Sequence, residues 1–178
     1  MANQLNFKAA NIVDVISMIE DYRLDIRTVT MGISLIGCTR STMEATADAV
    51  YDRVTTRAAR LVEVCEGIER ELGIPIVNKR VSVSPIALVA AGVEGNPADI
   101  AHALDRAASE LGINFIGGYS ALVEKGATEA DKRLIHSIPE ALSETNFVCG
   151  SVNIASSRAG INMDAVKTMG EVVKDAAA

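Results

Sequence analysis

The sequence predicts an α/β protein in which parallel strands alternate with helices. Four short runs rich in β-branched residues are each followed by a segment with helical periodicity. Hydrophobic residues make up 49% of the 178-residue chain, aromatic residues only 3%, and Trp is absent, so the core must consist of aliphatic side chains. Connections of helical length between strands require parallel pairing with right-handed crossovers.

The first three predicted elements occupy the N-terminal part of the chain. Apolar residues at helical spacing predict an amphipathic helix over residues 11–22. Alternating and then continuous apolar residues predict a strand over residues 25–38. Helical periodicity continues from residue 43 to residue 72, which predicts one long helix that Ser41 or Thr42 caps and Gly73 ends.

The other strands also precede helices. Runs rich in β-branched residues predict strands over residues 74–86, 113–118 and 146–157, and the strand over 113–118 is short and ends in two glycines. The segments between and after them predict helices over residues 96–112 and 128–144, and a last helix that begins at Asn162 or Asp164. Pro139 predicts a break within the helix over residues 128–144.

Four strands make an incomplete sheet. A parallel sheet is covered on both faces or closes on itself, and a closed barrel needs about eight strands. The sequence also stops within an apparent helix, without a capping signal. We therefore expect residues 1–178 to form a single α/β region that is a fragment of a longer domain or is completed by a second copy or another chain.

Composition excludes several classes of protein. The net charge is −6, with 17 basic residues scattered among 23 acidic ones, which argues against a nucleic-acid partner. The sequence contains no signal-peptide pattern and no apolar run of about 20 residues, so we expect a cytoplasmic protein without a membrane partner. Neither the three cysteines nor the two histidines show metal-ligand spacing, so no metal is predicted, and no motif identifies a cofactor.

Cys38 and Cys149 are the candidate catalytic residues. Each lies at or within a predicted strand, and the two thiols could face one cavity if those strands are neighbours. Arg40 and the following helix N-terminus would favour the thiolate of Cys38. The alternative is that both are inert packing residues, as we expect for Cys65 on the apolar stripe of the long helix.

Adjacent cations within the second strand predict an anion site. Strand alternation sends Lys79 to one face and Arg80, with Asn78 and Ser82, to the other. Arginine offers a planar fork to a carboxylate or phosphate, whereas lysine offers a point charge. The alternative is that one cation is exposed and the other is paired with an acid.

Two further segments supply candidate ligand-binding residues. The backbone N–H groups of Gly117 and Gly118 could hold an anion, although paired glycines also mark turns that need a positive φ. Residues 149–163 are dense in Ser, Asn and Gly beside an apolar strand, which indicates hydrogen bonding to a ligand or to a neighbouring strand. The candidates there are Ser151, Asn153, Ser156, Arg158 and Asn162.

Several long phrases resemble a known family. DIRTVTMGISL, ELGIPIVNKRVSVSPI, FIGGYSALVEKG and VCGSVNIASSRAGINM resemble those of an uncharacterised bacterial and archaeal family related to pyruvate formate-lyase. The resemblance implies the N-terminal part of a ten-stranded α/β barrel of the type shared by pyruvate formate-lyase and ribonucleotide reductase, and it implies self-association. It implies no reaction, because fold kinship alone does not carry function.

Two functions fit these residues. The first is an enzyme that acts on a small anionic metabolite at the rim formed by the carboxyl ends of the strands, where α/β proteins place their ligands. The alternative is a non-catalytic module that binds a metabolite for regulation, which needs a cation and hydrogen-bond donors but no nucleophile. Dependence on a thiol would distinguish the two.

Overall fold

A parallel sheet of four strands forms the centre of the protein. The computed structural model describes residues 9–21 and 25–178. The strands are β1 (Ile26–Ile33), β2 (Ile76–Val83), β3 (Phe115–Leu122) and β4 (Val148–Asn153). They lie in the order β1-β2-β3-β4, and every neighbouring pair is parallel. Each strand thus pairs with the one before it in the sequence, which confirms the prediction of a parallel sheet built from βα units.

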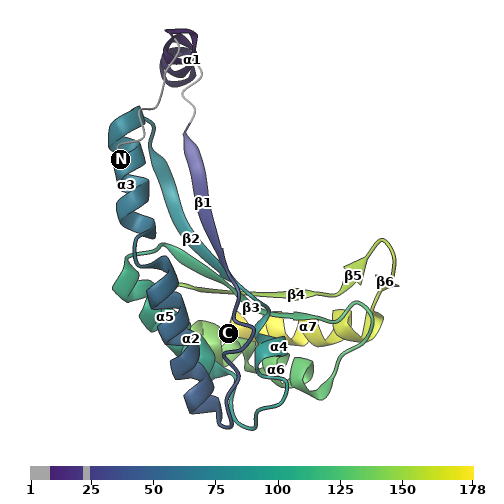
Figure 1. The fold of residues 1–178 in the computed structure, drawn as a ribbon. Helices are drawn as coiled ribbons and strands as arrows, with labels where there is room; N and C mark the ends of the chain where they lie inside the picture. The colour runs from purple at the N-terminus through teal and green to yellow at the C-terminus, as the bar shows by residue number, and fades with distance from the viewer. Residues whose placement is uncertain (1–8, 22–24) are drawn as a thin grey trace.

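Helices cover one face of this sheet. They are α1 (Ala9–Glu20), α2 (Met43–Ala58), α3 (Leu61–Leu72), α4 (Ile86–Val89), α5 (Ala98–Leu111), α6 (Glu129–Ser143) and α7 (Met163–Ala176). A small antiparallel hairpin of β5 (Ala155–Ser156) and β6 (Gly160–Ile161) precedes α7. Figure 1 shows α2, α3, α5, α6 and α7 on the same side of the sheet, whereas the opposite, concave side is uncovered. Within the described residues, no helix combines the length and apolar character needed to cross a bilayer.

The core lies between the sheet and its helices. Ile116 and Tyr119 of β3 are fully buried there, and the Tyr119 hydroxyl lies 2.5 Å from the Ser137 hydroxyl of α6. Burial raises the pKa of Tyr119 to about 12, because the phenolate would lose its hydration. Alanine residues of α5, among them Ala101, are also fully buried, and their small size lets this helix lie close to its neighbours.

The first strand is shorter than predicted. We expected it to run to Cys38, but it ends at Ile33. The Leu35 N–H instead bonds the Ser84 hydroxyl at 3.2 Å, and the Cys38 N–H bonds the Leu35 carbonyl at 2.9 Å, which closes a turn. Leu35 and Cys38 are therefore buried in a loop and do not extend the strand, whereas Ile36 between them is exposed.

The predicted long helix is divided into α2 and α3. Ala59 and Arg60 separate them, and Arg60 leaves helical geometry at φ −109°, ψ 5°. Thr42 caps α2 as predicted, since its hydroxyl accepts the Ala45 N–H at 3.2 Å, and Gly73 ends α3 at φ 69°. The break arises because α2 packs on α5, whereas α3 packs on β2 further along the curved sheet.

The third strand is longer than predicted, and its two glycines lie inside it. The register against β4 shifts between Gly117 and Tyr119, which marks a β-bulge at Gly118. The strand then continues to Leu122. The predicted break at Pro139 is also absent, because α6 is continuous, and Ile138 before the proline and Ala141 after it are both buried in the core.

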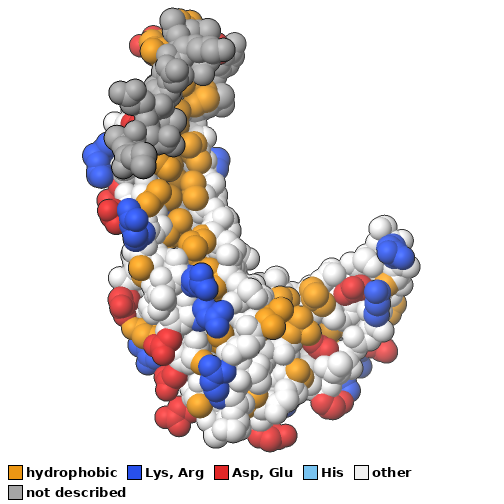
Figure 2. Space-filling view, in the orientation of Figure 1, with side chains coloured by type: hydrophobic (Ala, Val, Ile, Leu, Met, Phe, Trp, Pro, Cys, Tyr) orange, Lys and Arg blue, Asp and Glu red, His pale blue; other side chains and the backbone are white. Residues whose placement is uncertain are grey.

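The expected ten-stranded barrel is not what the described residues form. They form an open sheet with two unpaired edges, at β1 and at β4. Figure 2 shows the resulting hollow, with hydrophobic side chains along it.

Candidate functional site

The uncovered face of the sheet carries a row of residues with small or no side chains. Register partners across the four strands place Gly32, Ser82, Gly117 and Cys149 side by side. We call these four residues the open-face row. Val148 is buried on the helix side, and a Cβ at Gly150 would meet Leu142 and Ile138 of α6, so alternation turns Cys149 toward the open face. The row forms a shallow strip of backbone between taller side chains.

Arg80 lies next to this row on the same face. It pairs in register with Phe115, and its guanidinium lies over the Phe115 ring at 5.0 Å from the ring centre. A cation over an aromatic face is held in place electrostatically while its N–H groups stay available at the edges. Arg80 forms no ion pair with any residue that the structure describes.

Lys79 points to the opposite face, as strand alternation predicts. Its ammonium lies 3.2 Å from the Glu69 carboxylate of α3 and 3.1 Å from the Ile76 carbonyl. The Glu69 carboxylate also accepts the Ile76 N–H at 2.6 Å. This backbone hydrogen bond and, secondarily, Lys79 lower the pKa of Glu69. Lys79 therefore joins α3 to β2 and is not part of the open face.

The three thiols lie in different surroundings. Cys149 is exposed, whereas Cys38 and Cys65 are 1% and 2% exposed. Desolvation raises the pKa of the Cys65 thiol. Cys38 follows β1 and Cys149 lies in β4, at the two opposite edges of the sheet, so they do not share a cavity. Cys149 is the thiol that shares a face with Arg80.

Gly117 and Gly118 serve different purposes. A Cβ on Gly117 would meet nothing within 4 Å, so its missing side chain leaves the open-face row clear. Gly118 has φ 125°, and a Cβ there would lie 2.4 Å from Val83 Cγ2 and 2.6 Å from the Val83 carbonyl oxygen. Gly118 is therefore required by the bulge itself.

The polar residues after β4 divide between the face and the hairpin. Ser151 is exposed in β4 and pairs in register with Ser120. The Asn153 amide donates to Glu124 at 3.3 Å beside the end of β3. The Ser156 hydroxyl accepts the Ala159 N–H within the hairpin, and Asn162 caps α7 while donating to the Val123 carbonyl at 2.7 Å. Ser156 and Asn162 thus hold backbone of their own chain.

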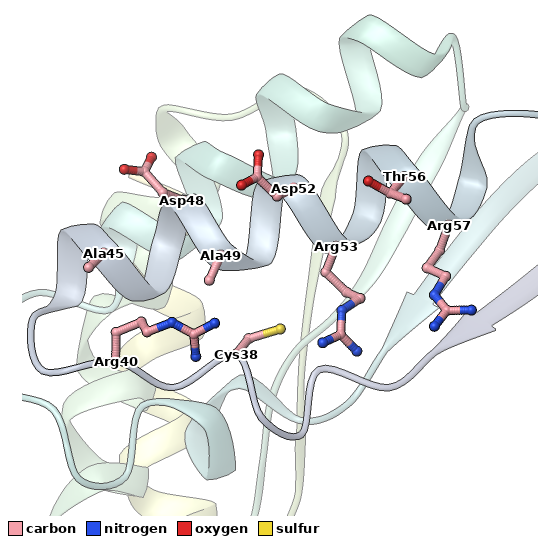
Figure 3. Close-up of a pocket in the computed structure, with 9 residues that line it drawn as sticks. All are labelled: Cys38, Arg40, Ala45, Asp48, Ala49, Asp52, Arg53, Thr56 and Arg57. Atoms are coloured by element: carbon pink, nitrogen blue, oxygen red, sulfur yellow. The ribbon is translucent and has the colours of Figure 1, made fainter.

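A second polar region surrounds Cys38. A cavity of about 670 Å³ lies between α2 and the loop after β1, and Figure 3 shows Arg40, Arg53 and Arg57 in a row beside the Cys38 sulfur. Arg53 and Arg57 were not among the site residues predicted from the sequence. Their signal was present as one helical stripe of spacing four, formed by Ala45, Ala49, Arg53 and Arg57.

The predicted site is thus brought together only in part. Arg80, Ser82, Gly117, Cys149 and Ser151 share the open face, but they do not gather at the carboxyl rim, because Ser82 is near the carboxyl end of β2 whereas Gly117 and Cys149 are near the amino ends of β3 and β4. Lys79, Cys38, Gly118, Ser156 and Asn162 lie elsewhere. Among the described residues, no three potential metal ligands of the types His, Cys, Asp or Glu are gathered.

Comparison with known proteins places the chain in a family. A family model described as "Uncharacterised ACR (DUF711)" matches residues 17–178. A UPF0210 protein of Corynebacterium glutamicum is 75% identical over 93% of this chain and 36% of its own length. UPF0210 proteins of Acetivibrio thermocellus and Streptococcus mutans are 59% and 53% identical, over 37% and 38% of their lengths. The chain spans a little more than a third of the curated relatives it matches.

These matches correct the resemblance suggested by the sequence phrases. The family model and the relatives carry the names DUF711 and UPF0210, and none of them links the chain to pyruvate formate-lyase. The phrases that carried the resemblance lie within the residues that the DUF711 model matches. Kinship with pyruvate formate-lyase therefore no longer supports a barrel or self-association.

Proposed function

The chain belongs to the DUF711 family, and from the geometry of its open face we propose that it binds a small anionic metabolite there, with Arg80 as the charged contact. The observation that supports the proposal is the guanidinium of Arg80 over Phe115, without an ion pair in the described residues and next to a row without large side chains. An unpaired arginine held by an aromatic ring is ready to accept an oxyanion, and the row leaves room for the ligand.

The chemistry of the surroundings suits one carboxylate or phosphate group with a polar body. The fork of Arg80 fits either group in a bidentate manner. Ser82 lies two residues further along the same strand and face, and Ser120 and Ser151 lie beyond the row on the next two strands. Ser120 and Ser151 are register partners, so a ligand lying across β3 and β4 would meet two hydroxyl groups about 5 Å apart, the spacing of neighbouring strands.

A second candidate function is catalysis at Cys149. It is favoured by one observation, the exposed thiol at the end of the open-face row. Strands β2 and β4 are about 10 Å apart, so a metabolite held by Arg80 could extend to this thiol.

The free exposed thiol of Cys149 also supports our proposal of a cytoplasmic location, because the cytosol keeps thiols reduced.

Titration with simple anions tests the binding site. Acetate, succinate and inorganic phosphate would each be added to the isotope-labelled chain and followed by NMR chemical shifts. We expect shifts at residues of β2 and β3, and we expect Arg80→Gln to weaken binding about tenfold or more, with Arg80→Lys intermediate. Arg27→Gln is the matched control. Arg27 is an exposed cation of the neighbouring strand β1, and strand alternation places it on the opposite face of the sheet from Arg80.

The results separate the two candidate functions. Equal affinity in the wild type and Arg80→Gln would reject the proposed anion site. If binding survives alkylation of Cys149, the open face binds without needing its thiol. Catalysis at Cys149 would require that Cys149→Ser retains binding but loses turnover of the bound compound.

A further inference from the structure

The cavity beside α2 has a floor of small residues and a wall of arginines. Ala45 and Ala49 leave the space open along the first half of the helix, and Arg53 and Arg57 continue the same stripe. Arg40 contributes a third guanidinium from the loop, and Figure 3 shows the three in a row. This region is separate from Arg80 and the open-face row, none of which lines the cavity.

The three arginines are not neutralised by acids of the described chain. None of them forms an ion pair there. Arg40 is anchored by its Nη1, which donates to the carbonyls of Gly37 and Thr39 at 2.8 and 2.9 Å. Its main chain is held as well, because the Arg40 N–H bonds the buried Thr46 hydroxyl at 2.9 Å. Arg40 thus presents its other N–H groups from a fixed position.

Asp48 and Asp52 also line the cavity, but their carboxylates point away from the arginines. Figure 3 shows the carboxylates of Asp48 and Asp52 on the opposite side of α2. Asp48 lies 3.8 Å from Arg106 of α5. Like charges one helical turn apart, as at Arg53 and Arg57, destabilise a helix unless an anion relieves them. The chain as a whole has a net charge of −6, which repels anions. The three arginines therefore form a local positive patch on a negatively charged protein.

The line of arginines continues beyond this cavity. A smaller cavity of about 200 Å³ at the edge of β1 is also lined by Arg53 and Arg57, together with Met31, Gly32, Ile33 and Ser34. Arg53 and Arg57 therefore border both spaces. Four residues of helix advance about 6 Å, so these guanidiniums suit two charged groups of one molecule better than a single group.

We infer that the groove formed by Arg40, Arg53 and Arg57 binds a small molecule with two or more planar or tetrahedral oxyanion groups. Its wall carries arginine and no lysine, which favours bidentate contacts to phosphate or carboxylate over a diffuse point charge. The larger cavity is in the size range of small-molecule sites, about 300–1,000 Å³. Arg80 lines neither cavity, although Gly32 of the open-face row lines the smaller one.

Calorimetric titration of the whole chain with pyrophosphate, citrate and inorganic phosphate tests this inference. We expect pyrophosphate or citrate to bind more tightly than phosphate, because two charged groups can reach two arginines. The double variant Arg53→Gln, Arg57→Gln should bind about tenfold more weakly or not at all. Pyrophosphate preference over citrate would identify phosphate groups, and the reverse would identify carboxylates.

Matched variants keep the result interpretable. Arg60→Gln with Arg70→Gln removes two arginine charges at α3, outside the groove, and should bind as the wild type does. Arg80→Gln should also leave this binding unchanged, which separates the two proposals. The inference is overturned if none of the three anions binds, if the groove variant binds equally well, or if the α3 variant loses as much affinity. Circular dichroism verifies that each variant is folded, and Arg57→Lys, which retains the charge, should show intermediate affinity.

Discussion

At the scale of single residues, two adjacent glycines should respond differently to the same substitution. Gly118→Ala places a Cβ against Val83 at a φ that side chains rarely adopt, and we expect it to lower the free energy of unfolding by about 2–4 kcal/mol. Gly117→Ala meets no atom within 4 Å, and we expect a loss below about 1 kcal/mol. Urea denaturation of both variants measures the difference. A larger loss for Gly117→Ala would contradict the bulge assigned to Gly118.

The thiols should be modified in the order of their exposure. We expect iodoacetamide to label Cys149 first, because Cys38 and Cys65 are buried and the raised pKa of Cys65 further reduces its thiolate. Timed labelling of the folded chain with mass-spectrometric mapping gives the order. Labelling of Cys38 before Cys149 would contradict the burial of the loop after β1.

Patterns in the sequence predicted the directions in which side chains point better than they predicted what surrounds those side chains. Alternation separated Lys79 from Arg80, and of the two residues expected to begin the last helix, Asn162 and Asp164, Asn162 is its cap. The expected reactivity of Cys38 depended on a strand that ran to residue 38. The turn between Leu35 and Cys38 and the bond from Leu35 to Ser84 join distant segments, so no local pattern reveals them.

At the scale of elements, the contact between α3 and β2 should weaken in acid. The pKa of Glu69 is lowered in the folded chain, so its carboxylate stabilises the fold above its unfolded pKa, and this contribution is lost as the pH falls through the lowered value. We expect Glu69→Gln to lower the Tm at pH 7 and to differ less from the wild type near pH 3. The control is Glu66→Gln, at an exposed position of α3. An unchanged Tm gap across this range would contradict the role of Glu69.

Elements were predicted well where local signals begin or end them. Thr42 and Gly73 act as caps as expected, and all four strands were found. The division between α2 and α3 was missed because apolar periodicity continues across Ala59 and Arg60. What breaks the helix is its packing on two different partners, α5 and β2, which only the assembled fold defines.

At the scale of the whole molecule, we expect the 178-residue chain to self-associate. A parallel sheet with one uncovered face and two free edges exposes apolar side chains and unpaired backbone groups. Leu122 is 51% and Phe115 38% exposed on that face. Sedimentation velocity should show a mass that rises with concentration, and Leu122→Glu should reduce the rise. A monomer at all concentrations with a cooperative two-state melt would contradict this expectation.

The shape of the molecule was not accessible from local patterns. Four βα units and an incomplete sheet were predicted, but the curvature that makes the open face concave depends on strand twist and on the bulge at Gly118. The arginine groove was missed for a similar reason, since Arg40 approaches Arg53 only through the fold of the loop between β1 and α2.

The strand order also bears on how the chain is made. Because β2 pairs with β1, β3 with β2 and β4 with β3, each strand after β1 finds a partner in residues that the ribosome has already released. Most contacts of this kind span a single βα unit, which keeps loop-closure costs low and favours fast folding. Once β2 has paired with β1, the nascent chain can add one unit at a time to the growing edge.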